Sequence, residues 1–359
     1  MRGEVLYFYA FDVANEVVAG RIGTVLDQRP APLGLRLKHA APKDVAFQRP
    51  LSVAPDLDAR LSGEAVRAEV HIFDVGVVSV VLRVGFERPT LGDLRPFRDP
   101  AVDDGRPLDR IAFDLCATAF RDLDGALVSP APPVEPEAYT VYCLSSLGEG
   151  TDAAAWLAQN RREAAGLLTG LDPNRLSDSH VTEATRIQRA LERDDLVVID
   201  WDAALVVDQA GPADDVLYVL EVANLQLEEF RTMDRALDRY LNRAYEDLGR
   251  RGPVTLFGAP TVVLRKLRWF RVDLAKLVDE VTNITKFVGD WYLARVYLGA
   301  GERFHLDHWR GSVERRLGQL DDLYSVARSE VFERRLLWLE VLMAAFFAID
   351  LIAILWWKR

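Results

Sequence analysis

The feature that most constrains this chain is an apolar segment near its C-terminal end, residues 336–357, with the sequence LLWLEVLMAAFFAIDLIAILWW. As one helix it would rise about 33 Å, close to the hydrocarbon thickness of a bilayer. Cationic pairs flank it, Arg334-Arg335 on one side and Lys358-Arg359 on the other, and tryptophans lie near both of its ends. Tryptophan prefers the two membrane interfaces. The segment therefore predicts a single transmembrane helix.

Two acidic residues within the segment count against this prediction. On an insertion scale its Leu, Ile, Val and Phe residues contribute about −4 to −7 kcal/mol, and a central Asp returns about +3 kcal/mol. The sum only mildly favours insertion, so a helix buried in a soluble protein stays open as the alternative. The residues expected to anchor the chain in a membrane are Trp338, Glu340, Asp350, Trp356 and Trp357.

Composition narrows the class of protein and its location. With 50% hydrophobic and 28% charged residues, the chain is neither disordered nor a disulfide scaffold. A net charge of −11 argues against a protein dominated by nucleic-acid electrostatics, and no specific nucleic-acid signature is present. The two cysteines, Cys116 and Cys143, fit a reducing compartment, and the N-terminus carries no secretory signal. The 38 arginines against six lysines suggest a GC-rich bacterial gene. We expect a single-pass protein of the bacterial inner membrane, with most of the chain in the cytoplasm.

Residues 1–150 are predicted to be rich in β-strands. Three runs of β-branched and aromatic residues are bounded by Pro, Gly and Asp: residues 5–11, 70–82 and 139–144. Residues 151–222 read as a mixed α/β segment. It is expected to hold helices at 151–168 and 179–193, two strands within 196–208, and a strand or a buried helix start at 217–222.

From residue 224 onward the apolar period changes from two to about 3.6, which is typical of helices. Residues 223–335 are therefore predicted to form a helical hairpin or bundle, including a long helical pattern at 263–284. Apolar residues at heptad spacing form a stripe that fits either an intramolecular hairpin or an oligomer. We assign this stripe as an oligomer seam, made by Val313, Leu317, Leu320, Tyr324, Ala327 and Val331.

Three segments in order along the chain carry a family resemblance. They are Ile72–Val78 with its Asp-x-Gly turn, Leu220–Phe230, and Arg335–Leu355 with its Leu-Glu start and second acid. Together they resemble the YagE-like family, also known as "required for meiotic nuclear division", of membrane-associated proteins. The eukaryotic members are mitochondrial inner-membrane proteins linked to translation. The resemblance implies a membrane-anchored homo-oligomer with a protein or ribosome-linked partner. It transfers no active site.

The chemistry-bearing residues form only weak patterns. His305 and His308 would share a helical face and could bind a metal with a carboxylate, but their spacing matches no established motif. A run of acids is compatible with metal-assisted hydrolysis or with solvated turns: Asp194, Asp195, Asp200, Asp202, Asp208, Asp214 and Asp215. The basic, aromatic stretch 264–271 fits lipid headgroups, RNA or a solvated helix face. We predict no catalytic residue, metal ligand or cofactor.

The sequence thus predicts an α+β protein with a β-rich N-terminal region and a helical C-terminal half that ends in a single hydrophobic, transmembrane helix (336–357). The predicted function is a membrane-anchored, homo-oligomeric scaffold or tether that contacts lipid through this helix. Two alternatives stay open. One is a soluble oligomeric interaction protein that buries the C-terminal helix, and the other is a metal-dependent hydrolase that uses the His and Asp residues.

Overall fold

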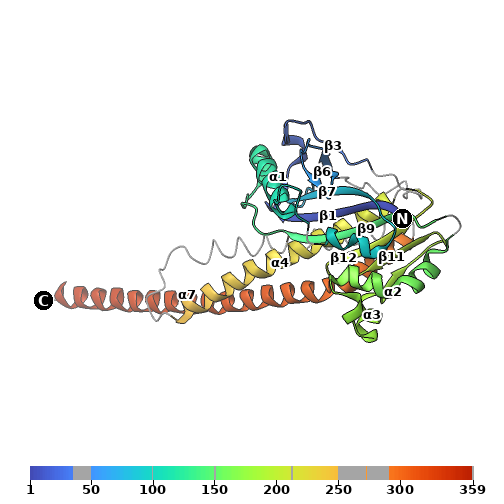
Figure 1. Ribbon diagram of the computed structural model, residues 1–359. Helices are drawn as coiled ribbons and strands as arrows, with labels where there is room; N and C mark the ends of the chain where they lie inside the picture. Colours follow the sequence, from blue (N-terminus) through green and yellow to red (C-terminus); the bar gives the residue numbers. More distant parts are fainter. Residues whose placement is uncertain are drawn as a thin grey trace. The chain divides into compact units, whose positions relative to one another are not determined.

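The computed structural model describes residues 1–34, 50–98, 100–148, 151–211, 213–249, 272 and 291–357. The chain divides into two compact units, each made from two stretches of sequence. The sheet unit comprises Met1–Thr232 with Asp273–Arg310, and the helical unit comprises Met233–Val272 with Gly311–Arg359. Two long helices, α4 and α7, contribute residues to both units (Figure 1).

A ten-stranded sheet forms the centre of the sheet unit. Its order is β10-β11-β12-β9-β1-β7-β6-β4-β3, with β5 paired to β6 beside this path. The pairing is antiparallel except between β12 and β9, which run parallel. The strands are β1 (Arg2–Asp12), β3 (Ala31–Pro32), β4 (Leu51–Val53), β5 (Arg60–Leu61), β6 (Glu64–Ile72), β7 (Val77–Glu87), β9 (Glu137–Ser146), β10 (Ile187–Arg189), β11 (Asp195–Ile199) and β12 (Ala203–Asp208). A separate pair is formed by β2 (Glu16–Val17) and β8 (Leu127–Val128).

The described helices follow the amphipathic segments of the sequence. The α-helices are α1 (Leu108–Asp122), α2 (Ala153–Thr169), α3 (Asp178–Ala184), α4 (Asp214–Gly249), α6 (Trp291–Arg303) and α7 (Leu306–Trp357). Short 3₁₀ helices are η1 (Ala19–Arg21), η2 (Leu91–Phe97), η3 (Asp124–Ala126) and η4 (Pro173–Arg175). Asp152 begins α2 by accepting the Ala155 backbone N–H at 2.9 Å, as an N-cap residue does.

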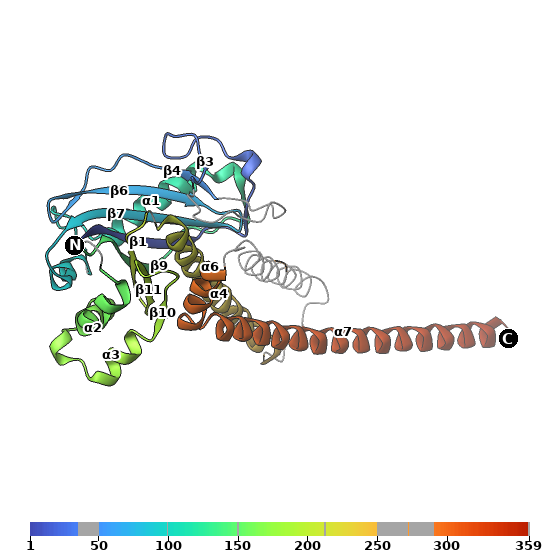
Figure 2. The same ribbon diagram turned by 90° about the vertical axis from the view of Figure 1, so that its right-hand side faces the viewer.

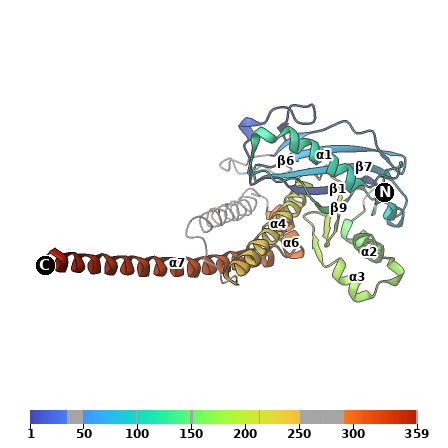
Figure 3. The ribbon, with the colours of Figure 1, turned by 90° about the vertical axis from the view of Figure 1, so that its left-hand side faces the viewer.

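Side chains of the central strands alternate between two faces of the sheet because successive residues of a strand point in opposite directions. Tyr7 and Leu82 face each other across β1 and β7 and belong to the main core, which also takes in residues of α1 and α2. The next pair, Phe8 and Val81, points to the opposite face. Figure 3 shows α1 lying across β6 and β7.

The opposite face of the sheet is covered by the first part of α4, up to Thr232, and by α6 (Figure 2). Asn224 of α4 donates to the Glu137 carbonyl oxygen of β9 at 3.2 Å. In α6, a Cβ added at Gly299 would lie 3.0 Å from the Ile187 side chain of β10. A side chain at this position would require Ile187 to shift by a few tenths of an ångström, so Gly299 eases the close approach of α6 to the sheet.

The turn between β6 and β7 depends on Gly76. Its φ angle is +95°, a backbone conformation that side chains disfavour, and an added Cβ would lie 1.8 Å from the Ala14 carbonyl oxygen. The Gly76 carbonyl oxygen in turn accepts the backbone N–H groups of Val13 and Ala14, at 3.0 and 3.1 Å. The turn is thus tied to the chain that follows β1.

The segment 179–193 differs from its expected helix. Helix α3 ends at Ala184, and Ile187 already pairs with Ile199 in the sheet. The Thr185 hydroxyl donates to the Val181 carbonyl oxygen at 2.7 Å at the point where the helix ends. Tertiary pairing of an apolar residue with β11 outweighs the local helical pattern here.

In the helical unit, the described residues of α4 and α7 bury an apolar layer. Leu237 and Leu241 of α4 are buried, as are Val313, Leu317 and Leu320 of α7. The Arg316 guanidinium connects the two helices, with 2.9 Å to an Asp234 carboxylate oxygen and 2.7 Å to Asp238. Three of the six predicted seam residues are therefore buried within one chain.

The predicted membrane helix is wrong. Across the described parts of the chain, no helix has an apolar stretch of the length that a bilayer crossing requires. The apolar segment forms the end of the 52-residue helix α7 rather than an element of its own, and the charged residue Glu340 lies within it. The large β-sheet region and the helical C-terminal half are present as expected. The predicted lipid contact, membrane localisation and single-pass anchor depend on this helix, so they are contradicted as well.

Several predictions fall on residues outside those described. They are the helical pattern at 263–284 and the basic stretch at 264–271. The same holds for the side chains of Trp338, Asp350, Trp356 and Trp357, and for the seam side chains of Tyr324, Ala327 and Val331.

Candidate functional site

The two histidines suggested as metal ligands lie near the junction of α6 and α7. His305, with a φ of +53°, places its ring edge-on to Trp201 at 5.1 Å between centroids, and His308 is exposed. Within the described ranges there is no group of three or more His, Cys, Asp or Glu side chains arranged to hold a metal ion. The metal-dependent hydrolase therefore has no assembled centre in these ranges.

Several aspartates of residues 194–215 make contacts that stabilise the fold. Asp195 accepts the backbone N–H of Leu191 at 2.9 Å and of Glu192 at 2.6 Å. Asp200 is paired with Arg303 of α6, and Asp202 lies 3.5 Å from Arg98. Such contacts close turns and dock α6 on the sheet.

A line of alternating charges crosses the α4-covered face of the sheet. It consists of Glu4 of β1, Arg83 of β7, Glu69 and His71 of β6, and Glu221 of α4, and we call it the charge chain. Arg83 reaches Glu4 at 3.0 Å and Glu69 at 3.2 Å. His71 lies 3.4 Å from Glu69 through Nε2 and 2.7 Å from Glu221 through Nδ1. The chain thus joins three strands to a helix.

Burial is greatest at the His71–Glu221 end of the charge chain, whereas Glu69, which precedes His71, is 31% exposed. The side chain of Glu4 is 26% exposed and that of Arg83 17%, whereas His71 and Glu221 are only 3% and 4% exposed. Burial disfavours the charged imidazolium, but the nearby carboxylates of Glu221 and Glu69 outweigh this and raise the pKa of His71 to about 9. Burial also acts on Glu69, yet the hydrogen bond to His71 and the charge of Arg83 leave the pKa of Glu69 lowered. His71 is therefore a buried cation at neutral pH.

Sequence reasoning missed the charge chain. Its signal in β6 is the polar set Arg67, Glu69 and His71 at every second position, which marks one face of a strand. Glu221 lies 150 residues from His71 in an apolar run, so its role becomes visible only in the fold.

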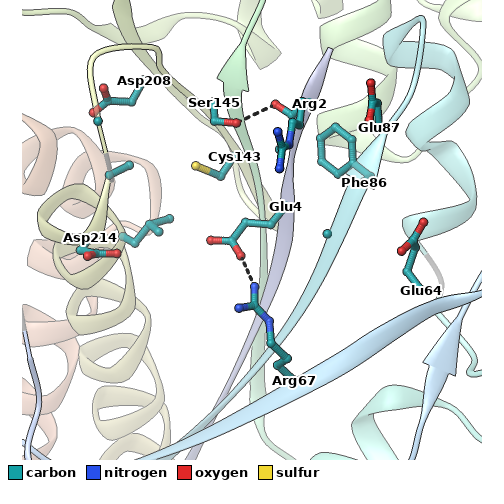
Figure 4. Close-up of a pocket in the computed structure, with 15 residues that line it drawn as sticks. Arg2, Glu4, Glu64, Arg67, Phe86, Glu87, Cys143, Ser145, Asp208 and Asp214 are labelled. Carbon is teal, nitrogen blue, oxygen red and sulfur yellow. Dashed lines mark hydrogen bonds and ion pairs between the residues drawn. The ribbon is translucent and has the colours of Figure 1, made fainter.

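A cavity of about 490 Å³ opens beside the outer end of the charge chain (Figure 4). The ends of β1, β6, β7 and β9 and the start of α4 form its walls. The lining residues that Figure 4 labels are mostly charged: Arg2, Glu4, Glu64, Arg67, Phe86, Glu87, Cys143, Ser145, Asp208 and Asp214. Arg67 donates to Glu4 at 3.0 Å across this space.

The polar groups of the cavity form no nucleophile–base pair among the described lining residues. Burial raises the pKa of the Cys143 thiol to about 12, so the thiolate needed for attack is absent at neutral pH. The Ser145 hydroxyl donates to the Arg2 carbonyl oxygen at 3.1 Å, and no histidine is among the lining residues. The cavity therefore offers no argument for covalent catalysis.

A second candidate site lies on α7, beyond the buried layer. Six large apolar side chains, each 45–64% exposed, share one side of the helix within about 140°, and we call them the apolar stripe. The apolar stripe consists of Leu336, Leu339, Leu342, Met343, Phe346 and Ile349. Phe347, 77% exposed, borders it, whereas Val341 lies on the other side of the helix. The seam prediction at 313–331 stays a prediction, although its first three members are buried within the chain.

Comparison with known proteins identifies the family of residues 2–214, which belong to the sheet unit. Residues 2–214 match the family model described as "Uncharacterized protein MJ0711, N-terminal domain", which covers more than half of the chain. The chain belongs to this family. The relative named Uncharacterized protein MJ0711, from Methanocaldococcus jannaschii, is 24% identical over 223 residues, or 60% of this chain. The match spans 65% of that relative's length. No solved structure matches.

Membership of the MJ0711 N-terminal domain family overturns the resemblance to the YagE-like family. The three segments behind that resemblance are the β6–β7 turn and parts of α4 and α7. A strand turn and amphipathic or apolar helices recur in unrelated folds, so their order was weak evidence. The implied ribosome-linked partner is withdrawn with it. The predicted bacterial source is also contradicted, because the relative is archaeal.

Proposed function

We propose that this protein is a self-associating scaffold in which the apolar stripe of α7 packs against the same stripe of a second copy. The observation that carries this proposal is the exposure of six large apolar side chains on one side of one helix. Isolated exposed apolar residues are ordinary on protein surfaces, whereas a contiguous patch marks a place where something binds.

Energy favours burial of the whole stripe rather than of single residues. Complete burial of a large aliphatic or aromatic side chain contributes about 1.5–3 kcal/mol. Association costs about 4–15 kcal/mol in lost freedom of motion. One or two buried side chains cannot offset that cost, but a stripe contributed by both copies can. A second copy of the chain carries an identical stripe. Its length and chemistry therefore match without any other partner.

The sheet unit supports the scaffold function in a different way. Its charge chain links α4 to three strands through contacts of 2.7–3.4 Å. Its buried His71–Glu221 pair resists separation, because removing one partner leaves an uncompensated charge. The sheet unit of each copy is thus suited to keep its structure when self-association brings two copies together.

The test is the molar mass of the full chain by size-exclusion chromatography with light scattering. We expect a dimer for the natural sequence and a monomer for the variant with Leu339→Glu and Phe346→Glu, because four carboxylates, two from each copy, would enter the interface. The matched control is Val341→Glu, which adds a charge on the other side of α7, at a residue that is 60% exposed. It is expected to remain dimeric.

A monomeric natural chain would overturn the proposal, as would equal masses for the stripe variant and the natural chain. A natural chain that is monomeric alone but floats with lipid vesicles would assign the stripe to lipid instead. Equal loss of dimer in the stripe variant and the Val341 control would show that added charge, rather than the stripe, is responsible.

A further inference from the structure

The apolar stripe reads the same in both directions along α7. Its members are separated by three, three, one, three and three residues, from Leu336 to Ile349. The midpoint lies between Leu342 and Met343. Each residue on one side of this midpoint therefore has an apolar counterpart at the same distance on the other side.

This symmetry distinguishes the two ways in which two identical helices can pair. In an antiparallel pair with a two-fold axis, the contact is isologous and each residue meets its counterpart from the other half. Leu336 then lies opposite Ile349 of the second copy, Leu339 opposite Phe346, and Leu342 opposite Met343. A parallel pair in register instead places each residue beside its own copy.

The charged positions favour the antiparallel pair. Glu340, which is exposed, comes to the level of the small residue Ala345 of the second copy. In the sequence, Arg335 and Asp350 occupy the two ends of the stripe, at equal distances from its midpoint. Antiparallel pairing brings these opposite charges to the same level, whereas parallel pairing brings each charge beside its like, which is unfavourable.

We propose that two copies of this chain pair through antiparallel α7 helices, centred between residues 342 and 343. This inference rests on the proposed self-association and adds its geometry. It predicts a two-fold symmetric assembly in which the two α7 helices enter the contact from opposite ends.

Cysteine crosslinking tests the geometry with the full chain. Leu336→Cys and Ile349→Cys variants are prepared separately, mixed, and oxidised with copper phenanthroline. Both positions are exposed, and the natural Cys116 and Cys143 are buried, so the natural chain serves as the blank. The mixture is expected to form a 336–349 disulfide between copies, because these positions are opposite each other.

Neither variant alone is expected to crosslink well. In the antiparallel pair the two copies of residue 336 are separated along the helix axis by 13 residues, roughly 20 Å. A disulfide needs Cα atoms about 4.4–6.8 Å apart. Val341→Cys, on the other side of α7, is the control for crosslinking by random collision.

The possible results separate the geometry from the association itself. A mixture that crosslinks several-fold more than either single variant supports the antiparallel pair. A Leu336→Cys variant that crosslinks alone as well as in the mixture overturns it in favour of a parallel pair, while self-association stands. Molar mass measured before oxidation reports on self-association separately, and a monomer there rejects both proposals.

Exchange of the end charges gives a second readout. The two-fold pair contains this contact twice, so Asp350→Arg is expected to weaken dimerisation up to about 30-fold, at about 0.2–1 kcal/mol for each surface-type ion pair. The double variant with Arg335→Asp restores opposite charges in the antiparallel register and should recover the affinity. Failure of the double variant to recover would contradict this register.

Discussion

The sheet unit and the end of α7 place their unusual side chains in opposite environments. In the sheet unit, His71 and Glu221 carry charges that normally face water, yet both are buried and each lies beside the other. On α7, apolar residues that normally lie in a core are exposed along one side. The first region thus completes its interactions within one chain, whereas the proposed self-association would cover the second with another molecule.

The largest predicted effect concerns the buried end of the charge chain. Glu221→Ala leaves the imidazolium of His71 without its closest partner, so we expect the free energy of unfolding to fall by about 3–5 kcal/mol. Urea denaturation measures this change. The control is Arg67→Ala, whose side chain is 68% exposed and whose pairing with Glu4 is expected to contribute less than about 1 kcal/mol. Similar losses in both variants would remove the distinction between buried and exposed charges.

Raising the pH acts on the same pair with a somewhat smaller effect. The pKa of His71 is about 9 in the folded chain and has its ordinary value of 6.5 in the unfolded chain. The contribution of this pairing to the free energy of unfolding is therefore complete below pH 6.5 and is lost as pH rises through 9. The difference corresponds to about 3 kcal/mol. Urea denaturation at a series of pH values should show a smaller decline for Glu221→Gln than for the natural chain. An equal decline in both would mean that another group titrates.

A moderate effect is expected in the buried layer of the helical unit. Arg316→Ala removes the contacts to Asp234 and Asp238, of 2.9 and 2.7 Å, and should lower the free energy of unfolding by about 1 kcal/mol. Leu317 is 4% exposed, so Leu317→Ala should lower the free energy of unfolding by about 2–5 kcal/mol more than a substitution at an exposed residue. If the leucine variant proves no worse than the arginine variant, this layer is not the core of the unit.

The smallest effect on stability belongs to the apolar stripe. Leu339→Glu with Phe346→Glu should change the unfolding free energy of the dissociated chain by less than about 0.5 kcal/mol, because neither side chain is buried. Thermal denaturation at low protein concentration measures this. A large loss there would show that these residues pack within their own chain.

Local pattern was sufficient for much of the sheet. Residues 5–11, 70–82 and 139–144 lie largely in β1, β6–β7 and β9, because runs of β-branched and aromatic residues favour extended structure wherever they pair. Residues 196–208 likewise hold β11 and β12. The helix expected at 151–168 is α2, which ends one residue later, at Thr169.

The sites depended on information that a single sequence does not carry. The charge chain joins residues as far apart as Glu4 and Glu221, and nothing local to Glu221 signals a partner on β6. The apolar end of α7 was recognised, but its length and composition alone suggested a bilayer. Exposure along one side of a single long helix, together with the mirror spacing of its apolar residues, became informative only once the helix boundaries were known.

The central claim is that the apolar stripe of α7 is covered by a second copy. Sedimentation equilibrium of the full natural chain over a wide concentration range tests it most directly. We predict one reversible step from monomer to dimer, with no larger species, because an antiparallel pair closes on itself. A chain that stays monomeric at every concentration, or that grows without limit, would contradict it.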